Sequence, residues 1–179
     1  ILISKIFLGI QFFQCYILIT LHQRINGFNN LSFQPEFNIA HIAAIGEVMV
    51  ELAPFPIDTP ETLNNISGGK GRDIMSLGFA GDTYNTSVYM SRLGLQTDYV
   101  TKLGEDSYSQ KIMQRMNSEK IGTGMIECIA GRSPGLYIIS NTPDGEREFS
   151  YWRKEAPARE LFSTPENSEA LFQKLKQCD

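Results

Sequence analysis

The sequence predicts an α/β fold with an antiparallel, lid-like portion, and two features of its pattern carry that prediction. From residue 41 to about residue 120, apolar runs typical of strands alternate with segments of helical periodicity. After Gly122, three strand-like runs follow one another and are divided by turn-forming residues. Because alternation favours a sheet covered by helices and consecutive strands favour hairpins, this mixture fits neither a barrel nor a helical bundle.

Composition narrows the class of protein and its partners. With 179 residues, 42% of them hydrophobic, the chain forms one globular domain or a domain cut short. A net charge of -4 without a basic run gives no footprint for nucleic acid, so we expect small molecules or protein as partners. The cysteines, Cys15, Cys128 and Cys178, lack the short pairings that zinc sites use. We therefore expect a reducing, cytoplasmic location and no metal site.

Residues 1–40 differ in character from the rest and are interpreted as a leader. The stretch 6–21 is uncharged, but it is shorter than the roughly 20 residues that span a bilayer, and it contains Gln11 and Gln14. No small-residue cleavage site follows it. A signal or anchor remains an alternative, whereas we expect an apolar, irregular leader with no membrane association and no part in a functional site.

The first orderly segment is residues 42–52, which reads as a core strand interrupted at Gly46 and Glu47. Residues 57–77 are rich in turn formers and read as a hairpin or loop. The GGKG at 68–71 is not a phosphate-binding Walker loop, because neither the Ser or Thr after the lysine nor the earlier glycine is present. No phosphate role is expected for this loop.

A helix is expected at residues 83–93, ending at Gly94, and the preceding Asp82 has two interpretations. Its carboxylate suits an N-cap that accepts amide hydrogens from the first turn. The glycine before it, Gly81, lets a backbone approach a ligand closely, and a helix start attracts oxygen-rich groups. Asp82 is therefore either a cap or a ligand-binding residue.

The remaining elements follow from the same periodicities. A helix at 108–120 carries an apolar stripe, and its methionines are expected to pack in the core rather than to bind a cofactor. The stripe consists of Tyr108, Ile112, Met113 and Met116. The expected strands are 98–103, 125–130, 135–140 and 148–153, with a turn and cap at 104–107, a tight turn at 143–145 and a last helix at 168–178.

Five segments in the same order resemble the ribokinase-like (PfkB) family of carbohydrate kinases, most of all its kinases of 2-keto-3-deoxygluconate. They are IGEVMVEL at 45–52, GFAGDTYNTSVYMSRLG at 78–94, YVTKLGEDSYSQKI at 99–112, PGLYIIS at 134–140 and GEREFSYWRKEAPAREL at 145–161. Together they extend over about 120 residues. One such motif alone would be weak, whereas five in order are hard to obtain by chance.

The resemblance implies a three-layer α/β/α sandwich with a small β lid, truncated before its C-terminal half. Residues 1–40 lie outside it, and 41–179 correspond to the sugar-binding and lid portion of the kinase domain. The family transfers phosphate from ATP, with Mg²⁺, to a terminal hydroxyl, and its catalytic Asp lies in a late DTxGAGD motif that is absent here. We therefore expect no catalytic residue and no ATP or Mg²⁺ site in this chain, which alone should be inactive.

The resemblance also implies the acceptor residues. Gly81, Asp82 and Asn85 match the early Gly-Asp-x-x-Asn motif that contacts the sugar, so Asp82 is expected to bind a hydroxyl rather than to act as the base. Many relatives have a glycine where Ala80 stands.

Three further positions, Tyr137, Tyr151 and Arg153, resemble the groups that hold the keto-acid end, where a guanidinium suits a carboxylate. Taken without the resemblance, they are ordinary strand residues with alternating exposure. Glu47 and Glu51 would lie roughly 13 Å apart on one strand, too far to share one reacting centre.

The sequence is compatible with one expected partner and with more than one function. The expected partner is a sugar acid, with a possible homodimer through the lid. Alternatives are another sugar kinase of the family, such as a fructokinase, and a non-catalytic remnant that binds a sugar or a protein.

Overall fold

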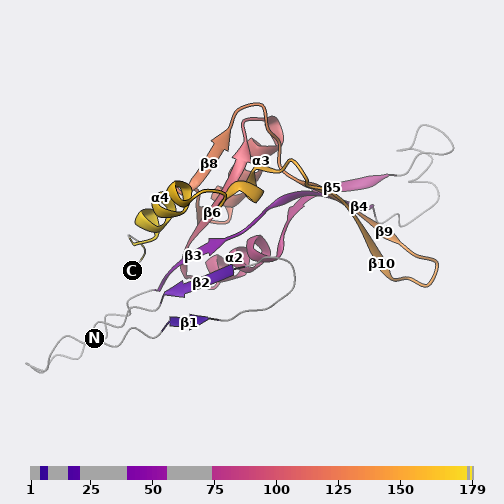
Figure 1. The fold of residues 1–179 in the computed structure, drawn as a ribbon. Coiled ribbons are helices and arrows are strands. Elements are labelled where there is room, and N and C mark those ends of the chain that lie inside the picture. Colours follow the sequence, from indigo (N-terminus) through magenta and orange to yellow (C-terminus); the bar gives the residue numbers. More distant parts are fainter. Residues whose placement is uncertain (1–4, 8–15, 21–39, 56–73, 177, 179) are drawn as a thin grey trace, which may run out of the picture.

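The computed structural model describes residues 5–7, 16–20, 40–55, 74–176 and 178, which form two sheets and the helices that cover them (Figure 1). The main sheet contains β1 (Lys5–Phe7), β2 (Tyr16–Thr20), β3 (His41–Ile45), β6 (Gln96–Gly104), β7 (Ile121–Gly122) and β8 (Ile126–Ile129). The second sheet, called the lid here, contains β4 (Met49–Pro54), β5 (Met75–Ala80), β9 (Leu136–Asn141) and β10 (Arg147–Trp152). The helices are α2 (Asp82–Arg92), α3 (Ser107–Ser118), the 3-10 turn η1 (Pro157–Glu160) and α4 (Pro165–Leu175).

The main sheet is the middle of three layers. β3 and β6 pair in parallel, and their side chains alternate between the two faces. Ala44 packs in a buried cluster with side chains of α2 and α3, whereas its neighbours Ala43 and Ile45 pack with Leu171 and Leu175 of α4. Figure 1 shows α2 and α4 on opposite sides of β3. The predicted α/β/α layering is therefore confirmed.

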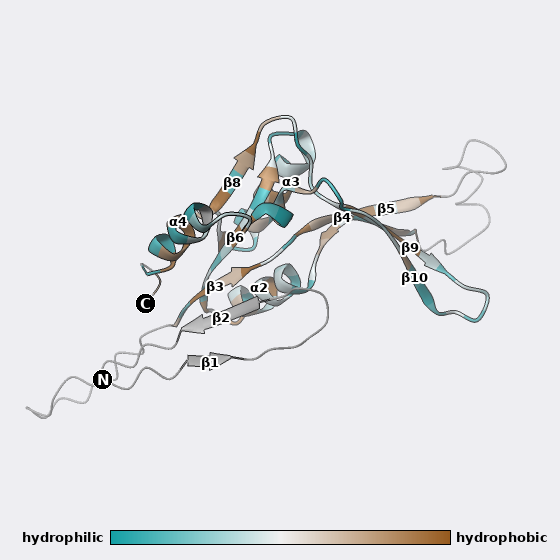
Figure 2. Cartoon of the chain, in the orientation of Figure 1, coloured by the Kyte–Doolittle hydropathy of each residue, from teal (hydrophilic) through white to brown (hydrophobic). Residues whose placement is uncertain are grey.

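The lid extends away from the main sheet and has the strand order β10-β9-β4-β5 (Figure 1). β4 pairs antiparallel with β5 and parallel with β9, and β9 pairs antiparallel with β10. All six residues of β10 are exposed, and its hairpin with β9 is hydrophilic at the tip, whereas β3 and β8 are largely hydrophobic (Figure 2). β10 therefore presents open surface. Two buried clusters lie against the main sheet, and a smaller one in the lid consists of Met49, Ala80, Tyr137 and Ile139.

The single strand expected at residues 42–52 is instead two strands in two different sheets. The chain leaves the main sheet at Gly46, where a Cβ atom would lie 2.1 Å from Thr83 Oγ1. Thr83 itself is buried and hydrogen-bonded to Tyr99 Oη at 2.7 Å, so it has no room to give way. The close approach of α2 thus requires glycine at the point where β3 ends, and β4 then begins the lid.

Two smaller expectations also need correction. Residues 57–77 are expected to form a hairpin or a loop, and residues 75–77 belong to β5, which pairs with β4 as in a hairpin. Residues 56–73, which include the GGKG, lie outside the described residues. In α3, Ile112 and Met116 are buried as predicted, but Tyr108 is 41% exposed. It lies in the first turn of the helix, beside Lys111.

The leader contributes strands to the main sheet in the part that the structure describes. β2 pairs antiparallel with β3, with Leu18 opposite Ala43, and β1 pairs with β2. The leader is therefore not irregular throughout, and the boundary at residue 40 stays a prediction. Among the described residues, no helix has the length and apolar character needed to cross a membrane.

Candidate acceptor site

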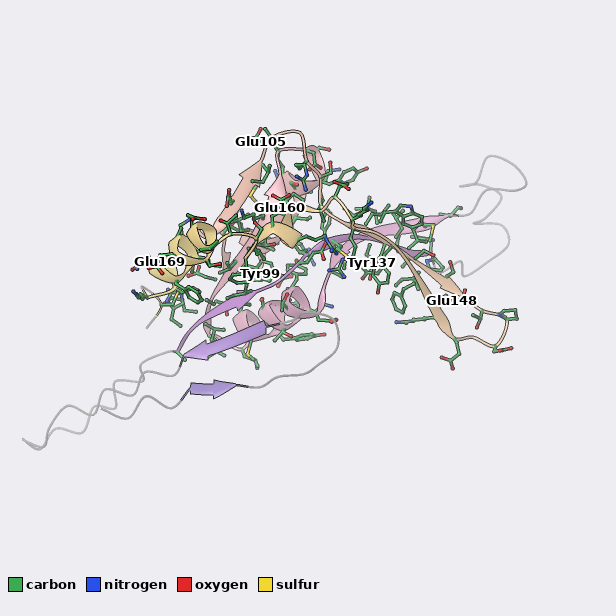
Figure 3. The ribbon with its side chains drawn as sticks, viewed as in Figure 1. Tyr99, Glu105, Tyr137, Glu148, Glu160 and Glu169 are labelled. Carbon is green, nitrogen blue, oxygen red and sulfur yellow. The ribbon has the colours of Figure 1, made fainter. Side chains whose placement is uncertain are left out.

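Four residues form a row across the lid where it joins the main body. The strand register places Gly78 of β5 opposite Glu51 of β4, Glu51 opposite Tyr137 of β9, and Tyr137 opposite Tyr151 of β10. Figure 3 shows Tyr137 at this junction. The row brings together two of the predicted acceptor residues, Tyr137 and Tyr151, and adds Glu51.

Tyr137 and Glu51 are directly hydrogen-bonded. The Tyr137 hydroxyl donates to Glu51 Oε2, and the Tyr137 side chain is only 7% exposed. Burial raises the pKa of the Tyr137 phenol well above its usual value of 10, and the hydrogen bond to the Glu51 carboxylate raises it further. At neutral pH the phenol therefore keeps its proton and holds Glu51 in place.

Aromatic rings surround this hydrogen bond. Tyr151 lies 5.7 Å and Phe149 6.0 Å from Tyr137 between ring centroids, and Phe149 and Tyr151 are stacked on each other at 17°. Tyr151 is 53% exposed, so this residue is open to a ligand. The rings supply an apolar wall of the kind on which the carbon face of a sugar packs.

Asp82 starts α2 but does not cap it, so its interpretation as an N-cap is wrong. The cap position is Gly81, and among the residues that the structure describes no side chain caps the free amides there. Asp82 is exposed in the first turn, and its charge is among the groups that raise the pKa of Tyr137. Because this carboxylate serves no capping role, it is available for a ligand beside the Tyr137 row.

Gly81 allows α2 to begin close to the turn between β3 and β4. A Cβ atom at Gly81 would lie 2.4 Å from the carbonyl oxygen of Glu47, which is backbone and cannot move aside. Glycine is therefore required for α2 to begin this close to the turn between β3 and β4.

Arg153, which follows β10, forms an ion pair with Glu47. Nη2 of Arg153 contacts Oε2 of Glu47, whose side chain is 11% exposed, against 28% for Arg153. Burial raises the pKa of the Glu47 carboxyl above its usual value, and the nearby Arg153 opposes that rise only in part. Glu47 Oε1 and Arg153 Nε are shut off from solvent and have no hydrogen-bond partner among the described residues. Functional sites are one place where such costly unpaired atoms are retained.

A cavity of about 250 Å³ adjoins this ion pair. Glu47 and Arg153 line it together with a second guanidinium, that of Arg159 in η1, and with the apolar side chains of Ile45 and Phe162. Sequence reasoning missed both Glu47 and Arg159 as site residues. The ordered motifs contain both positions, but only the fold shows that residues 47, 153 and 159 line one cavity.

One predicted acceptor residue lies apart from this group. Asn85 is exposed on α2 and lines a different hollow, of about 310 Å³, with Phe79, Tyr89 and Arg92. Its backbone amide donates to Gly81 O in the first turn. None of the contacts described for Asn85 joins it to Tyr137, Tyr151 or Arg153.

The chemistry of the gathered groups suits a polyhydroxylated acid. Carboxylates such as those of Asp82 and Glu51 can accept hydrogen bonds from hydroxyl groups, tyrosine rings can provide an apolar wall, and a guanidinium such as that of Arg153 can pair with a carboxylate. Among the described residues, no glycine-rich phosphate-binding loop lies next to this group. The arrangement thus offers groups of the kinds that bind hydroxyls and a carboxylate.

A mixed main sheet between helix layers, in which β3, β6, β7 and β8 run parallel, and a separate lid of strands define a ribokinase-like α/β fold. The profile of the pfkB family carbohydrate kinases matches residues 39–176. The chain belongs to the pfkB family of carbohydrate kinases.

Individual proteins similar to this chain are also sugar kinases. The chain is 38% identical to the 2-dehydro-3-deoxygluconokinase of Dickeya dadantii over 143 residues, which are 78% of this chain and 41% of the relative. It is 23% identical to a fructokinase of Solanum tuberosum over 125 residues, which are 70% of this chain and 36% of that enzyme. The chain thus spans about 40% of the length of the curated relatives that it matches.

Solved structures agree on the fold. A fructokinase of Xylella fastidiosa with bound ATP superposes with a TM-score of 0.54 at 20% identity, covering 65% of this chain and 34% of that one. A PfkB family carbohydrate kinase of Listeria grayi gives 0.54 at 19% identity, covering 72% and 38%. These similarities show a shared fold.

Proposed function

We propose that this chain carries the acceptor-binding part of a kinase that phosphorylates a terminal hydroxyl of 2-keto-3-deoxygluconate or a closely related keto-acid sugar. The observation that carries the proposal is the Glu51–Tyr137 hydrogen bond, with the Asp82 charge near Tyr137. The buried Glu47–Arg153 ion pair supports it, because Glu47 precedes β4 and Arg153 follows β10, the strands that carry Glu51 and Tyr151. Higher identity to a 2-dehydro-3-deoxygluconokinase than to a fructokinase supports the acid over a neutral sugar.

In this proposal each group has a distinct task. Asp82 and the Glu51–Tyr137 pair bind hydroxyls of the acceptor, and Tyr151 covers its carbon face. Glu47 fixes the plane of the Arg153 guanidinium, which leaves Nη1 to receive the acceptor's carboxylate. A charged donor held in one orientation binds a planar carboxylate more strongly than a mobile one, because less entropy is lost on binding.

ATP and Mg²⁺ remain part of the proposal for the whole kinase. The described acceptor groups suit hydroxyls and a carboxylate, so they do not fit the triphosphate, and no step of the transfer is assigned to them beyond orienting the acceptor. The nucleotide site and the base that activates the hydroxyl are expected in the part of the kinase domain that this chain does not match. A cytoplasmic location and a homodimer through the lid belong to the same proposal.

The test is calorimetric titration of this chain with 2-keto-3-deoxygluconate and, separately, with fructose. Replacing Arg153→Leu should weaken keto-acid binding by about 10- to 100-fold, as expected for loss of a hydrogen bond to a charged group, and leave fructose binding nearly unchanged. Arg147→Leu removes an exposed arginine from β10, the strand that Arg153 follows, and should change neither. Equal losses for both sugars in Arg153→Leu would contradict the carboxylate-binding role, and tighter binding of fructose by the unaltered chain would favour the fructokinase alternative.

A further inference from the structure

A second cluster of polar side chains lies at the start of β3, whereas the Glu47 ion pair follows its end. The cluster contains His41 of β3, Asp98 of β6 and Cys178, which follows α4. One ligand atom from each, a ring nitrogen, a carboxylate oxygen and the sulfur, lies within 4.8 Å of the other two. We propose that these three side chains bind a transition metal ion of the zinc class.

The fold brings the three ligands together on one face of the sheet. The register places His41 opposite Gln96 and Ala43 opposite Asp98, so His41 and Asp98 are diagonal neighbours on the face that α4 covers. Cys178 packs against the same buried cluster, which includes Ala43 and Leu175. His41 of β3, Asp98 of β6 and Cys178 after α4 are far apart in the sequence, but each contributes one ligand atom at the same place in the fold.

The distances suit a tetrahedral ion after small side-chain movements. His41 Nε2 and Asp98 Oδ2 are hydrogen-bonded at 2.6 Å, and their side chains are 16% and 24% exposed. In a tetrahedral zinc site with bonds of about 2.0 to 2.3 Å, neighbouring ligand atoms lie roughly 3.3 to 3.8 Å apart. His41 adopts the tautomer with its proton on Nδ1, and the ion takes the place of the proton between Nε2 and Oδ2. The nitrogen and oxygen then separate by roughly 0.7 Å, and the sulfur moves inward.

The neighbour of Asp98 restricts its carboxylate. A Cβ atom at Gly122 would lie 1.6 Å from Asp98 Oδ1, so only glycine leaves room for the carboxylate in this position. With Oδ1 directed at Gly122, Oδ2 is the oxygen that faces His41. This carboxylate thus presents one defined ligand atom before any ion binds.

The donor set selects the class of metal. Imidazole nitrogen and thiolate sulfur favour zinc and similar transition metals, whereas Mg²⁺ prefers oxygen ligands alone. On binding, the Cys178 thiol releases its proton to solvent, and the charges of one carboxylate and one thiolate neutralise the dication. Three protein ligands leave one position for water. The ion would connect the end of α4 to β3 and β6, a stabilising role separate from any phosphoryl transfer.

The test uses the full chain with Cys15→Ser and Cys128→Ser, in which Cys178 is the remaining thiol. Cobalt(II) is the probe, because a cobalt–thiolate bond gives a near-ultraviolet charge-transfer absorption. We expect this band to saturate at one equivalent, to disappear when zinc is added, and to persist in excess Mg²⁺. Zinc at about 100 times its Kd should raise Tm by about 5 to 10 °C.

Replacing Cys178→Ser in the chain that retains Cys15 and Cys128 should abolish the band, and His41→Ala or Asp98→Asn should weaken cobalt binding at least 10-fold. Far-ultraviolet circular dichroism checks that each variant is folded. The site is refuted when the folded Cys178-only chain shows no cobalt–thiolate band, when Cys178→Ser leaves the band unchanged, or when His41→Ala and Asp98→Asn bind cobalt as the parent does. Neither sugar nor ATP takes part, so these results are independent of the proposed kinase activity.

Discussion

Glu47 and Arg153 lie 106 positions apart in the sequence and meet as a largely buried ion pair beside the candidate acceptor site. Ion pairs of this kind add little net stability over an apolar pair, because both charges must leave water. Removing one partner is nevertheless costly, since the other is left buried and uncompensated. The pair is therefore better explained by the orientation that it imposes on Arg153 than by its contribution to folding.

The raised pKa of the Glu47 carboxyl predicts a pH-dependent stability. Burial raises this pKa above 4.5, against the opposing effects of Arg153 and Arg159. Because the folded chain binds the proton more tightly than the unfolded chain does, this contribution is complete below about pH 4.5 and is lost as pH rises through the folded pKa. Urea unfolding from pH 4 to 7 should show the stability of the parent falling relative to Glu47→Gln over that window. If the stability of the parent relative to Glu47→Gln stays constant from pH 4 to 7, or increases with pH, the raised pKa is contradicted.

At the scale of elements, helices α2 and α3 begin in different ways. Asp106 caps α3, and its Oδ1 accepts hydrogen bonds from the amides of Tyr108 at 2.8 Å and Ser109 at 3.3 Å. At α2 the cap is Gly81, and Asp82 leaves the free amides untouched. An acidic residue at a helix start thus has a structural task in one helix and is available for binding in the other.

This difference predicts opposite outcomes for two aspartate substitutions. Asp106→Ala should destabilise the chain by about 1 kcal/mol, the usual cost of losing a cap, and leave sugar binding unaffected. Asp82→Ala should cost about 0.5 kcal/mol or less, through the helix dipole alone, but abolish most keto-acid binding. Urea unfolding and calorimetry on both variants measure the two quantities. Normal sugar binding by Asp82→Ala would rule out its role in the acceptor site.

A second element-scale prediction concerns the start of β9. A Cβ atom at Gly135 would lie 2.7 Å from Glu47 Oε1, 3.0 Å from Arg153 Cβ and 3.1 Å from Met49 Cγ. Gly135→Ala should therefore destabilise the chain by about 1 to 3 kcal/mol and weaken keto-acid binding, because the ion pair must shift. Gly124→Ala is the matched control, since its Cβ would meet nothing within 4 Å. Equal urea midpoints for the two variants would show that the ion pair tolerates displacement.

At the scale of the whole molecule, the lid carries apolar surface without a described covering. β10 is an edge strand of its sheet, and Phe149, Tyr151 and Trp152 on it are 47%, 53% and 57% exposed. Open edge strands with exposed aromatic residues pair readily with other chains unless something blocks them. The homodimer through the lid, proposed above, would cover this edge.

The dimer can be tested by sedimentation velocity. We expect the parent chain to sediment as a dimer at micromolar concentration and Trp152→Glu to sediment as a monomer, because a charge at the paired edge disfavours association. Phe172→Glu, which places the same charge at an exposed aromatic of α4, should leave the dimer intact. Dissociation by both variants alike would indicate general destabilisation, and a monomeric parent would exclude the dimer under these conditions.

The sequence by itself determined the family, the three-layer class and most elements, because hydrophobic periodicity, turn residues and ordered motifs are local properties that survive without coordinates. Helix α3, with buried Ile112 and Met116, follows from such spacing. It did not reveal that the chain changes sheets at Gly46, or that Gly81 rather than Asp82 caps α2, because both depend on how closely α2 approaches the β3–β4 turn. Nor did it bring Glu47 to Arg153 or His41 to Cys178. Contacts between distant positions are set by strand register and layer packing, and only the tertiary structure decided them.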